Sequence, residues 1–116
     1  RFSPKRYYSF TILLTNSSHI KNLNKKFRNK NKATDVLSFP FYENKKLFKS
    51  KQKNIYLGDI AISFEIIFKR SINQVFLNEF NKVWVHGFLH LLGYDHIQNK
   101  DYKKMKLLEN RILKST

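Results

Sequence analysis

The stretch HGFLHLLGYDH, residues 86–96, decides how the rest of this sequence is interpreted. It holds three of the four histidines of the chain and two of its three glycines. An apolar run with histidines at positions i and i+4 is typical of a helix, because those two positions lie on one face. Gly93 then predicts the end of that helix, since glycine adopts the left-handed C′ conformation without a Cβ clash.

Outward from this stretch, β-rich composition and amphipathic spacing predict the remaining elements. Strands are expected at 9–15, 36–41 and 55–63, and helices at 18–27, 64–69, 73–92 and 100–113. Pro40 confines the second strand to an edge or a strand end, because proline donates no ladder hydrogen bond. Gly58 predicts a bulge or a close backbone approach in the third strand. Residues 42–54 are expected to form a lysine-rich hairpin connection.

The element order β-α-β-β-α-α-α predicts an α+β fold: a small mixed β-sheet flanked by helices, one of them a metzincin-like helix bearing the histidines. A length of 116 residues fits a single domain over residues 1–116, and 41% hydrophobic residues argue against disorder. The sequence has no apolar run of about 18 residues, which a membrane span needs, and no signal-peptide core.

The chain has no cysteine, which excludes disulfides and thiolate zinc sites, so a metal must be bound by histidine and carboxylate. The net charge of +15 suggests a polyanionic partner, either nucleic acid or an acidic surface. Abundant Lys, Asn, Ile and Phe offer another explanation, because an A+T-rich genome imposes those residues without selecting a partner. Between residues 21 and 53, many lysines and arginines are opposed only by Asp35 and Glu43.

The three clustered histidines predict a metal site. His86 and His90 can direct two imidazoles to one point, and the turn at Gly93 lets His96 reach the same point. Three nitrogens at about 2.0–2.1 Å leave a fourth tetrahedral position open, as in catalytic zinc sites. Two histidines at this spacing could equally be packing or surface residues. Gly87 replaces the general-base glutamate of a metalloprotease, and either space for a substrate or close helix packing would explain it.

HGFLHLLGYDH, together with ATDVLSFPF (residues 33–41) and LGDIAIS (residues 57–63), closely resembles the YbeY family of bacterial rRNA-maturation endoribonucleases. The resemblance covers about residues 10–113. It implies a zinc-dependent, single-strand-specific endoribonuclease that acts in maturation of the 16S rRNA 3′ end and in ribosome quality control. The implied partners are single-stranded rRNA and the small ribosomal subunit, in the cytoplasm, with no membrane and no DNA. Family members carry more residues before the first strand, so a truncated N-terminus is expected.

The resemblance also implies the site residues. The three metal ligands fall on His86, His90 and His96, which would hold one Zn²⁺ per chain. The functionally important arginine of the family falls on Arg28, just before ATDVLSFPF. The hypothesis is phosphodiester cleavage at the metal, with Arg28 stabilising the charge that develops on phosphorus. A solvated cation in a basic loop is the competing interpretation of Arg28.

Several other side chains are candidates near these motifs. Asp59 or Asp95 could accept the second ring N–H of a ligand histidine, or could instead stabilise the Gly58 bend or cap a turn. Ser38 and Pro40 could lie along the substrate or serve only the sheet. The remaining assignments are packing: Trp84, Phe88, Leu89, Leu91, Leu92 and Met105 are expected in the core, Tyr94 either stacks on a base or packs, and His19 is expected to be exposed.

Two alternative functions remain open from the sequence. A metal-dependent protease fits the histidine spacing but conflicts with Gly87 and with the positive charge. A non-catalytic module that binds RNA or the ribosome, with a structural metal, fits the charge but needs a fourth protein ligand.

Overall fold

The computed structural model describes residues 6–42, 53–94 and 99–115. Its elements in chain order are β1 (Tyr7–Thr15), α1 (Ser17–Arg28), β2 (Val36–Pro40), β3 (Asn54–Ser63), α2 (Phe64–Arg70), α3 (Phe76–Leu91) and α4 (Asn99–Ser115). This order is the predicted one. The helix α3 begins nearly one turn later than expected, because its N-cap, Val75, offers no side-chain acceptor that would mark the start in the sequence.

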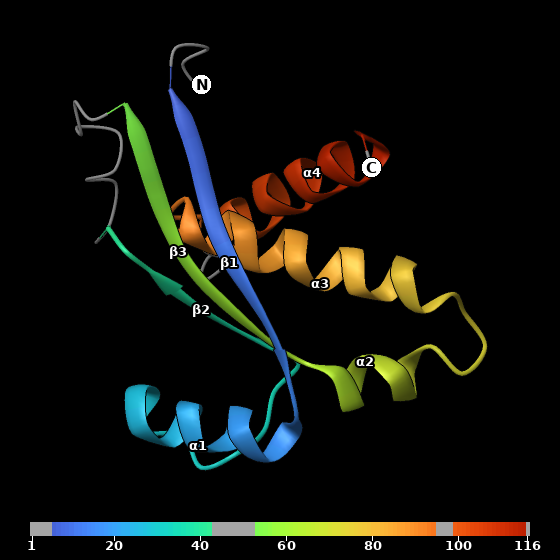
Figure 1. The fold of residues 1–116 in the computed structure, drawn as a ribbon. Helices are drawn as coiled ribbons and strands as arrows, with labels where there is room; N and C mark the ends of the chain where they lie inside the picture. Colours follow the sequence, from blue (N-terminus) through green and yellow to red (C-terminus); the bar gives the residue numbers. More distant parts are fainter. Residues whose placement is uncertain (1–5, 43–52, 95–98, 116) are drawn as a thin grey trace.

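The three strands form one mixed sheet in the order β1-β3-β2 (Figure 1). The central strand β3 pairs in parallel with β1 and antiparallel with β2. The prediction of an α+β fold with a small mixed sheet is therefore confirmed. Pro40 ends β2, which is an edge strand, so its missing N–H interrupts no interior ladder.

Gly58 meets both expectations for it. The pairing of β1 with β3 shifts register between Ser9 and Thr11, opposite the β3 segment that contains Gly58. The φ angle of Gly58 is +137°, and an added Cβ would lie 2.3 Å from the carbonyl oxygen of Phe39. Only glycine tolerates both the bulge conformation and this approach of the β2 backbone.

Helices cover both faces of the sheet. On one face, Ile60 and Ile62 of β3 join the main core with residues of α3 and with Met105 of α4. On the other face, Ala61 contacts Ile20 of α1 in a smaller cluster. Successive strand residues point to opposite faces, so neighbouring β3 residues serve the two clusters. In Figure 1, α1 and α3 accordingly lie on different sides of the strands.

The core contains the residues that the sequence assigned to it. Leu89, Leu91, Leu92 and Met105 are almost fully buried, and Trp84 and Phe88 pack against them in partly buried positions. The N-cap of α1 is Asn16, whose side chain accepts a hydrogen bond from the His19 backbone N–H at 2.8 Å. His19 is exposed, as expected. Across the described ranges, every helix is too short or too polar to span a bilayer.

Candidate metal and phosphate site

His86 and His90 lie on the same face of α3, and their Nε2 atoms are 3.1 Å apart. The ring centroids are 4.7 Å apart, with the rings nearly perpendicular. Both side chains are part-buried. The i, i+4 spacing thus brings two imidazole nitrogens to one point, as the sequence predicts.

The other ring nitrogen of His86 is held by α4. Its Nδ1 lies 2.6 Å from Oε2 of Glu109, whose side chain is only 13% exposed. An ionised carboxylate only accepts hydrogen bonds, so Nδ1 of His86 carries the proton. In a neutral imidazole this tautomer directs the lone pair of Nε2 toward His90.

The other ring nitrogen of His90 is held by the end of its own helix. Its Nδ1 donates to the backbone oxygen of Tyr94 at 2.9 Å, because a carbonyl oxygen can only accept. Gly93, at φ +97°, donates its N–H to the carbonyl of His90, and Tyr94 donates its N–H to that of Leu89. These two bonds form a Schellman motif, so the glycine that ends α3 also positions the carbonyl that orients His90.

The two tautomers make this pair a fit for a metal ion. Two nitrogen lone pairs that face each other at 3.1 Å repel unless a proton or a cation lies between them. Two nitrogens bound to one tetrahedral zinc are about 3.3–3.4 Å apart, which is close to the observed distance. Within the described ranges, no third His, Cys, Asp or Glu completes a metal-holding group. His96, the predicted third ligand, lies outside the described residues.

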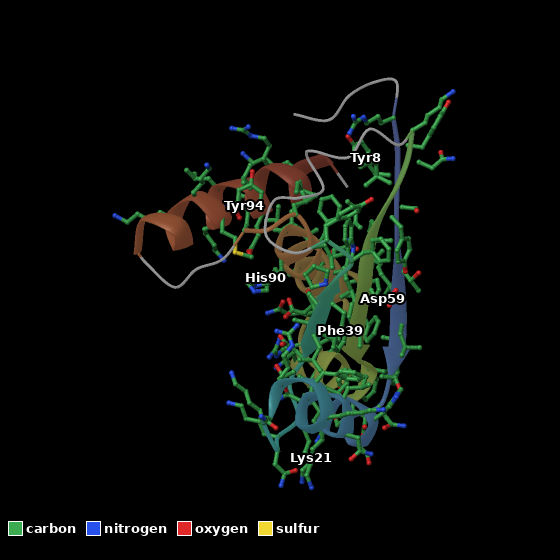
Figure 2. All side chains as sticks on the ribbon, turned by 90° about the vertical axis from the view of Figure 1, so that its left-hand side faces the viewer. Tyr8, Lys21, Phe39, Asp59, His90 and Tyr94 are labelled. Carbon is green, nitrogen blue, oxygen red and sulfur yellow. The ribbon has the colours of Figure 1, made fainter. Side chains whose placement is uncertain are left out.

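The histidine pair opens into a cleft of about 620 Å³ between the edge of β2 and α3. The lining is mixed, with three cationic side chains, two carboxylates and two tyrosines. The lining residues are Arg28, Thr34, Asp35, Val36, Leu37, Ser38, Pro40, Tyr42, Arg70, Lys82, Val83, His86, His90, Gly93, Tyr94 and Glu109. Figure 2 shows His90 and Tyr94 on the α3 side of this region.

Arg28 reaches this cleft from the last turn of α1. The helix ends at Asn29, which adopts the left-handed conformation at φ 56°. The Arg28 guanidinium donates to the backbone oxygen of Ser38 and lies 5.5 Å from the centroid of the Phe39 ring. These contacts bring Arg28 across the edge of β2 to the cleft that contains His86 and His90. The structure therefore places three of the four predicted site residues in one cleft.

Gly87 is explained by helix packing. An added Cβ would lie 2.9 Å from Cγ2 of Ile60, 3.1 Å from Oγ of Ser38 and 3.2 Å from Cγ2 of Val36. The Ser38 hydroxyl also donates to the Gly87 carbonyl at 3.0 Å. The missing side chain therefore allows α3 to approach the sheet, and the alternative of space for a substrate is wrong at this position.

The expectation that Asp59 supports a ligand histidine is also wrong. Its carboxylate accepts from the Tyr56 hydroxyl, and Figure 2 shows Asp59 on the side of the sheet away from His90. The hydrogen bond to Asp59 raises the pKa of Tyr56, because it stabilises the protonated phenol. The extra residue of the β3 bulge changes which side chains face α3, and the sequence does not reveal that register. Asp95 lies outside the described residues.

Glu109 is the site residue that the sequence analysis missed. It lies on α4 one turn after Met105, which is 2% exposed, so an acidic residue follows the buried stripe of an amphipathic helix. A carboxylate at such a position needs a partner, and that was the available signal. Ser38 and Pro40 line the cleft, as does Tyr94, which also packs against the core.

Comparisons with known proteins agree with the resemblance seen in the sequence. A family model described as "Endoribonuclease YbeY" matches residues 2–116. A protein of that name from Pelagibacter ubique is 52% identical over 122 residues, covering 98% of this chain and 77% of that protein. The one from Thermodesulfovibrio yellowstonii is 38% identical, covering 89% of this chain and 64% of that protein. The solution structure of TM1509 from Thermotoga maritima superposes with a TM-score of 0.60 at 30% identity, covering 90% of this chain and 65% of that chain.

Proposed function

This chain belongs to the endoribonuclease YbeY family, and on that premise we propose that it is a metal-dependent endoribonuclease that cleaves single-stranded RNA. The observation that carries the proposal is the pair of Nε2 atoms, 3.1 Å apart, that open into a cleft also lined by Arg28. His86 and His90 would hold the ion together with His96, and zinc suits three imidazole ligands. When bound, the ion would supply positive charge that polarises a phosphate oxygen and activates a water molecule.

The protein contributes orientation and charge around that point. Glu109 holds the proton of His86 on Nδ1, and the Tyr94 carbonyl does the same for His90, so both Nε2 atoms act as electron-pair donors. Fixed imidazoles lose little freedom when a ligand binds, which favours tight binding. The cleft walls from β2 and α3 exclude part of the bulk water and strengthen these interactions.

Arg28 would bind the phosphate group that reacts. Its guanidinium is anchored by the Ser38 carbonyl, and the remaining N–H donors match two oxygens of one phosphate. Charge that builds up on those oxygens during cleavage is stabilised by donors already in position. Arg28→Lys keeps the positive charge but loses the planar pair of donors, so we expect slower cleavage with unchanged zinc content.

The biological role proposed here is maturation of the 16S rRNA 3′ end and ribosome quality control in the cytoplasm, with the small ribosomal subunit as partner. It is supported by the family membership and by the charge of +15, which suits a polyanionic partner. The exposed lysines of α1, namely Lys21, Lys25 and Lys26, add positive charge to the helix from which Arg28 reaches the cleft.

One assay separates this proposal from its alternatives. Zinc-loaded protein is incubated with single-stranded RNA, duplex RNA and casein, with and without a chelator. We expect chelator-sensitive cutting of single-stranded RNA alone. Casein cleavage would instead indicate a protease, and RNA binding without cleavage would indicate a non-catalytic module. The packing of Gly87 against Ile60 disfavours the protease, because the general-base position of that mechanism faces the sheet.

A further inference from the structure

The cleft has two chemically different ends. The carboxyl-terminal part of α3 follows β2 toward Pro40, because Gly87 lies over Val36 and Ser38, and Leu91 approaches Gly58, the partner of Pro40. The end beyond His90 is lined by tyrosines. The other end, before His86, is lined by Arg70 and Lys82. Neither of these cations has a role in the function proposed above.

Lys82 lies one helical turn before His86 on α3 and lines the same cleft. Four residues of an α-helix advance about 6 Å, so Lys82, His86 and His90 form a row along one face. The Lys82 side chain is 58% exposed, and its ammonium lies 3.1 Å from Oε2 of Glu79. An ammonium has three N–H donors, so this ion pair leaves capacity for a second anion.

Arg70 approaches from the last turn of α2 and faces the same end. Its Nη1 donates to Oδ2 of Asp35 at 2.7 Å, and its side chain is 48% exposed. A guanidinium has five N–H donors, and an exposed ion pair of this kind is weak. Asp35 therefore orients Arg70 at the cleft without preventing it from binding a phosphate.

From this arrangement we propose that Arg70 and Lys82 form a second phosphate-binding subsite for the RNA backbone. The subsite binds a phosphate next to the one at His86 and His90, on the side away from Tyr94. This inference rests on the proposed function, because it extends the path of the same RNA strand. The subsite also fixes how the RNA strand lies in the cleft. The phosphate on one side of the reacting phosphate contacts Arg70 and Lys82, and the nucleotides on the other side lie at the end with Tyr42 and Tyr94.

The test measures whether the cations of the subsite contact one particular phosphate of the RNA. Metal-free protein, in which cleavage is blocked by a chelator, is titrated with single-stranded RNA that carries one neutral methylphosphonate at successive positions. We expect one position where neutralisation weakens binding of the wild type about tenfold but hardly affects Lys82→Ala. The double variant Lys82→Ala/Arg70→Gln should bind unmodified RNA with a salt slope lower by about 0.7, which is the contribution of the one single-strand phosphate contact that it loses.

Matched variants exclude a general effect of charge. Lys69→Ala/Lys103→Ala removes the same charge from two exposed lysines that do not line the cleft. It should keep the positional loss seen in the wild type. Lys82→Arg and Arg70→Lys should retain most of the coupling, and circular dichroism of each variant checks its fold. Equal losses at every phosphate position, or disappearance of the positional loss in Lys69→Ala/Lys103→Ala, would overturn the proposal.

Cleavage kinetics separate this inference from the proposed function. In zinc-loaded protein, Lys82→Ala should raise KM for single-stranded RNA more than it lowers kcat, because the subsite binds substrate and does not contact the reacting phosphate. If the wild type binds RNA without cutting it, the proposed function fails, and the methylphosphonate titration still measures the subsite. If the wild type cuts RNA but shows no positional coupling, the subsite alone is refuted.

Discussion

The two histidines of α3 are oriented by two different regions of the molecule. His90 is held by the end of its own helix. Its Nδ1 donates to the carbonyl of Tyr94, four residues along the chain, and the turn at Gly93 positions that carbonyl. His86 is held by Glu109, which lies 23 residues away on α4. The first support depends on local backbone geometry, and the second depends on the packing of one helix against another.

This difference predicts how each support fails. A local support persists as long as α3 ends correctly, because its hydrogen bonds join neighbouring residues. A support between helices also requires α4 to remain docked, and Met105 contributes to that docking by being almost fully buried. The proposed metal site should therefore be more sensitive to changes in α4 than to changes in the turn after α3.

The largest effect is expected when one of the two histidines is itself removed. His90→Ala and His86→Ala each delete an imidazole, so neither support has anything left to orient. Zinc measured by elemental analysis should fall well below one ion per chain, and cleavage of single-stranded RNA should drop by about 10²–10³-fold, as for loss of a group that acts in the transition state. His19→Ala, an exposed histidine outside the cleft, is the control. Full zinc content in either variant would refute the pair as ligands.

The second prediction breaks only the support from α4. Glu109→Ala leaves the Nδ1 proton of His86 without its acceptor, so the ring can rotate and its tautomer is no longer fixed. Loss of such a partner costs about 10–100-fold in metal affinity. Competition with a zinc-binding dye measures it. Glu79→Ala is a close control, because the Glu79 side chain is 14% exposed and that of Glu109 13%, while Glu79 pairs with Lys82. Equal losses of metal affinity in Glu109→Ala and Glu79→Ala would mean that negative charge near the site, and not the hydrogen bond to His86, determines the metal affinity.

The helix end that supports His90 was predictable, although the Tyr94 carbonyl was not named as the acceptor. Histidine spacing, the apolar run and Gly93 all act within a few residues, and the periods of helices and the conformational freedom of glycine determine their result. The element order and the edge position of Pro40 follow from equally local rules.

The support at His86 could not be predicted in the same way. Which carboxylate reaches His86 depends on how α4 docks on α3, and the sequence offered Asp59 or Asp95 because both are near the motifs along the chain. The bulge at Gly58 instead leaves Asp59 with Tyr56. Likewise, the sequence around Gly87 does not show whether the missing side chain leaves room for a substrate or allows close helix packing, because the contact with Ile60 forms only in the folded chain.

The third prediction weakens the local support. Gly93→Ala forces a side chain into a backbone conformation at φ +97°, which costs about 1–2 kcal/mol and loosens the turn that holds the Tyr94 carbonyl. Metal affinity should fall by less than in Glu109→Ala, because Tyr94 can still reach His90 when the turn adjusts. The same dye competition measures it. Asn29→Ala, at the left-handed position that ends α1, is the control: it should lower the thermal midpoint without changing metal affinity.

The smallest effect is expected on the side of the sheet away from the site. Tyr56→Phe removes the hydroxyl that donates to Asp59, an exposed pair, so the free energy of unfolding should fall by only about 0.5 kcal/mol. Because the folded state raises the pKa of Tyr56, the wild type keeps this contribution at neutral pH and loses it as the pH rises through that raised pKa. Urea unfolding at pH 7 should therefore separate the two proteins, and a series at increasing pH above the ordinary tyrosine pKa of about 10 should bring them together as the pH passes the raised pKa of Tyr56. Metal affinity should not change, and a loss comparable to that in Glu109→Ala would show that the polar network of β3 also supports His86.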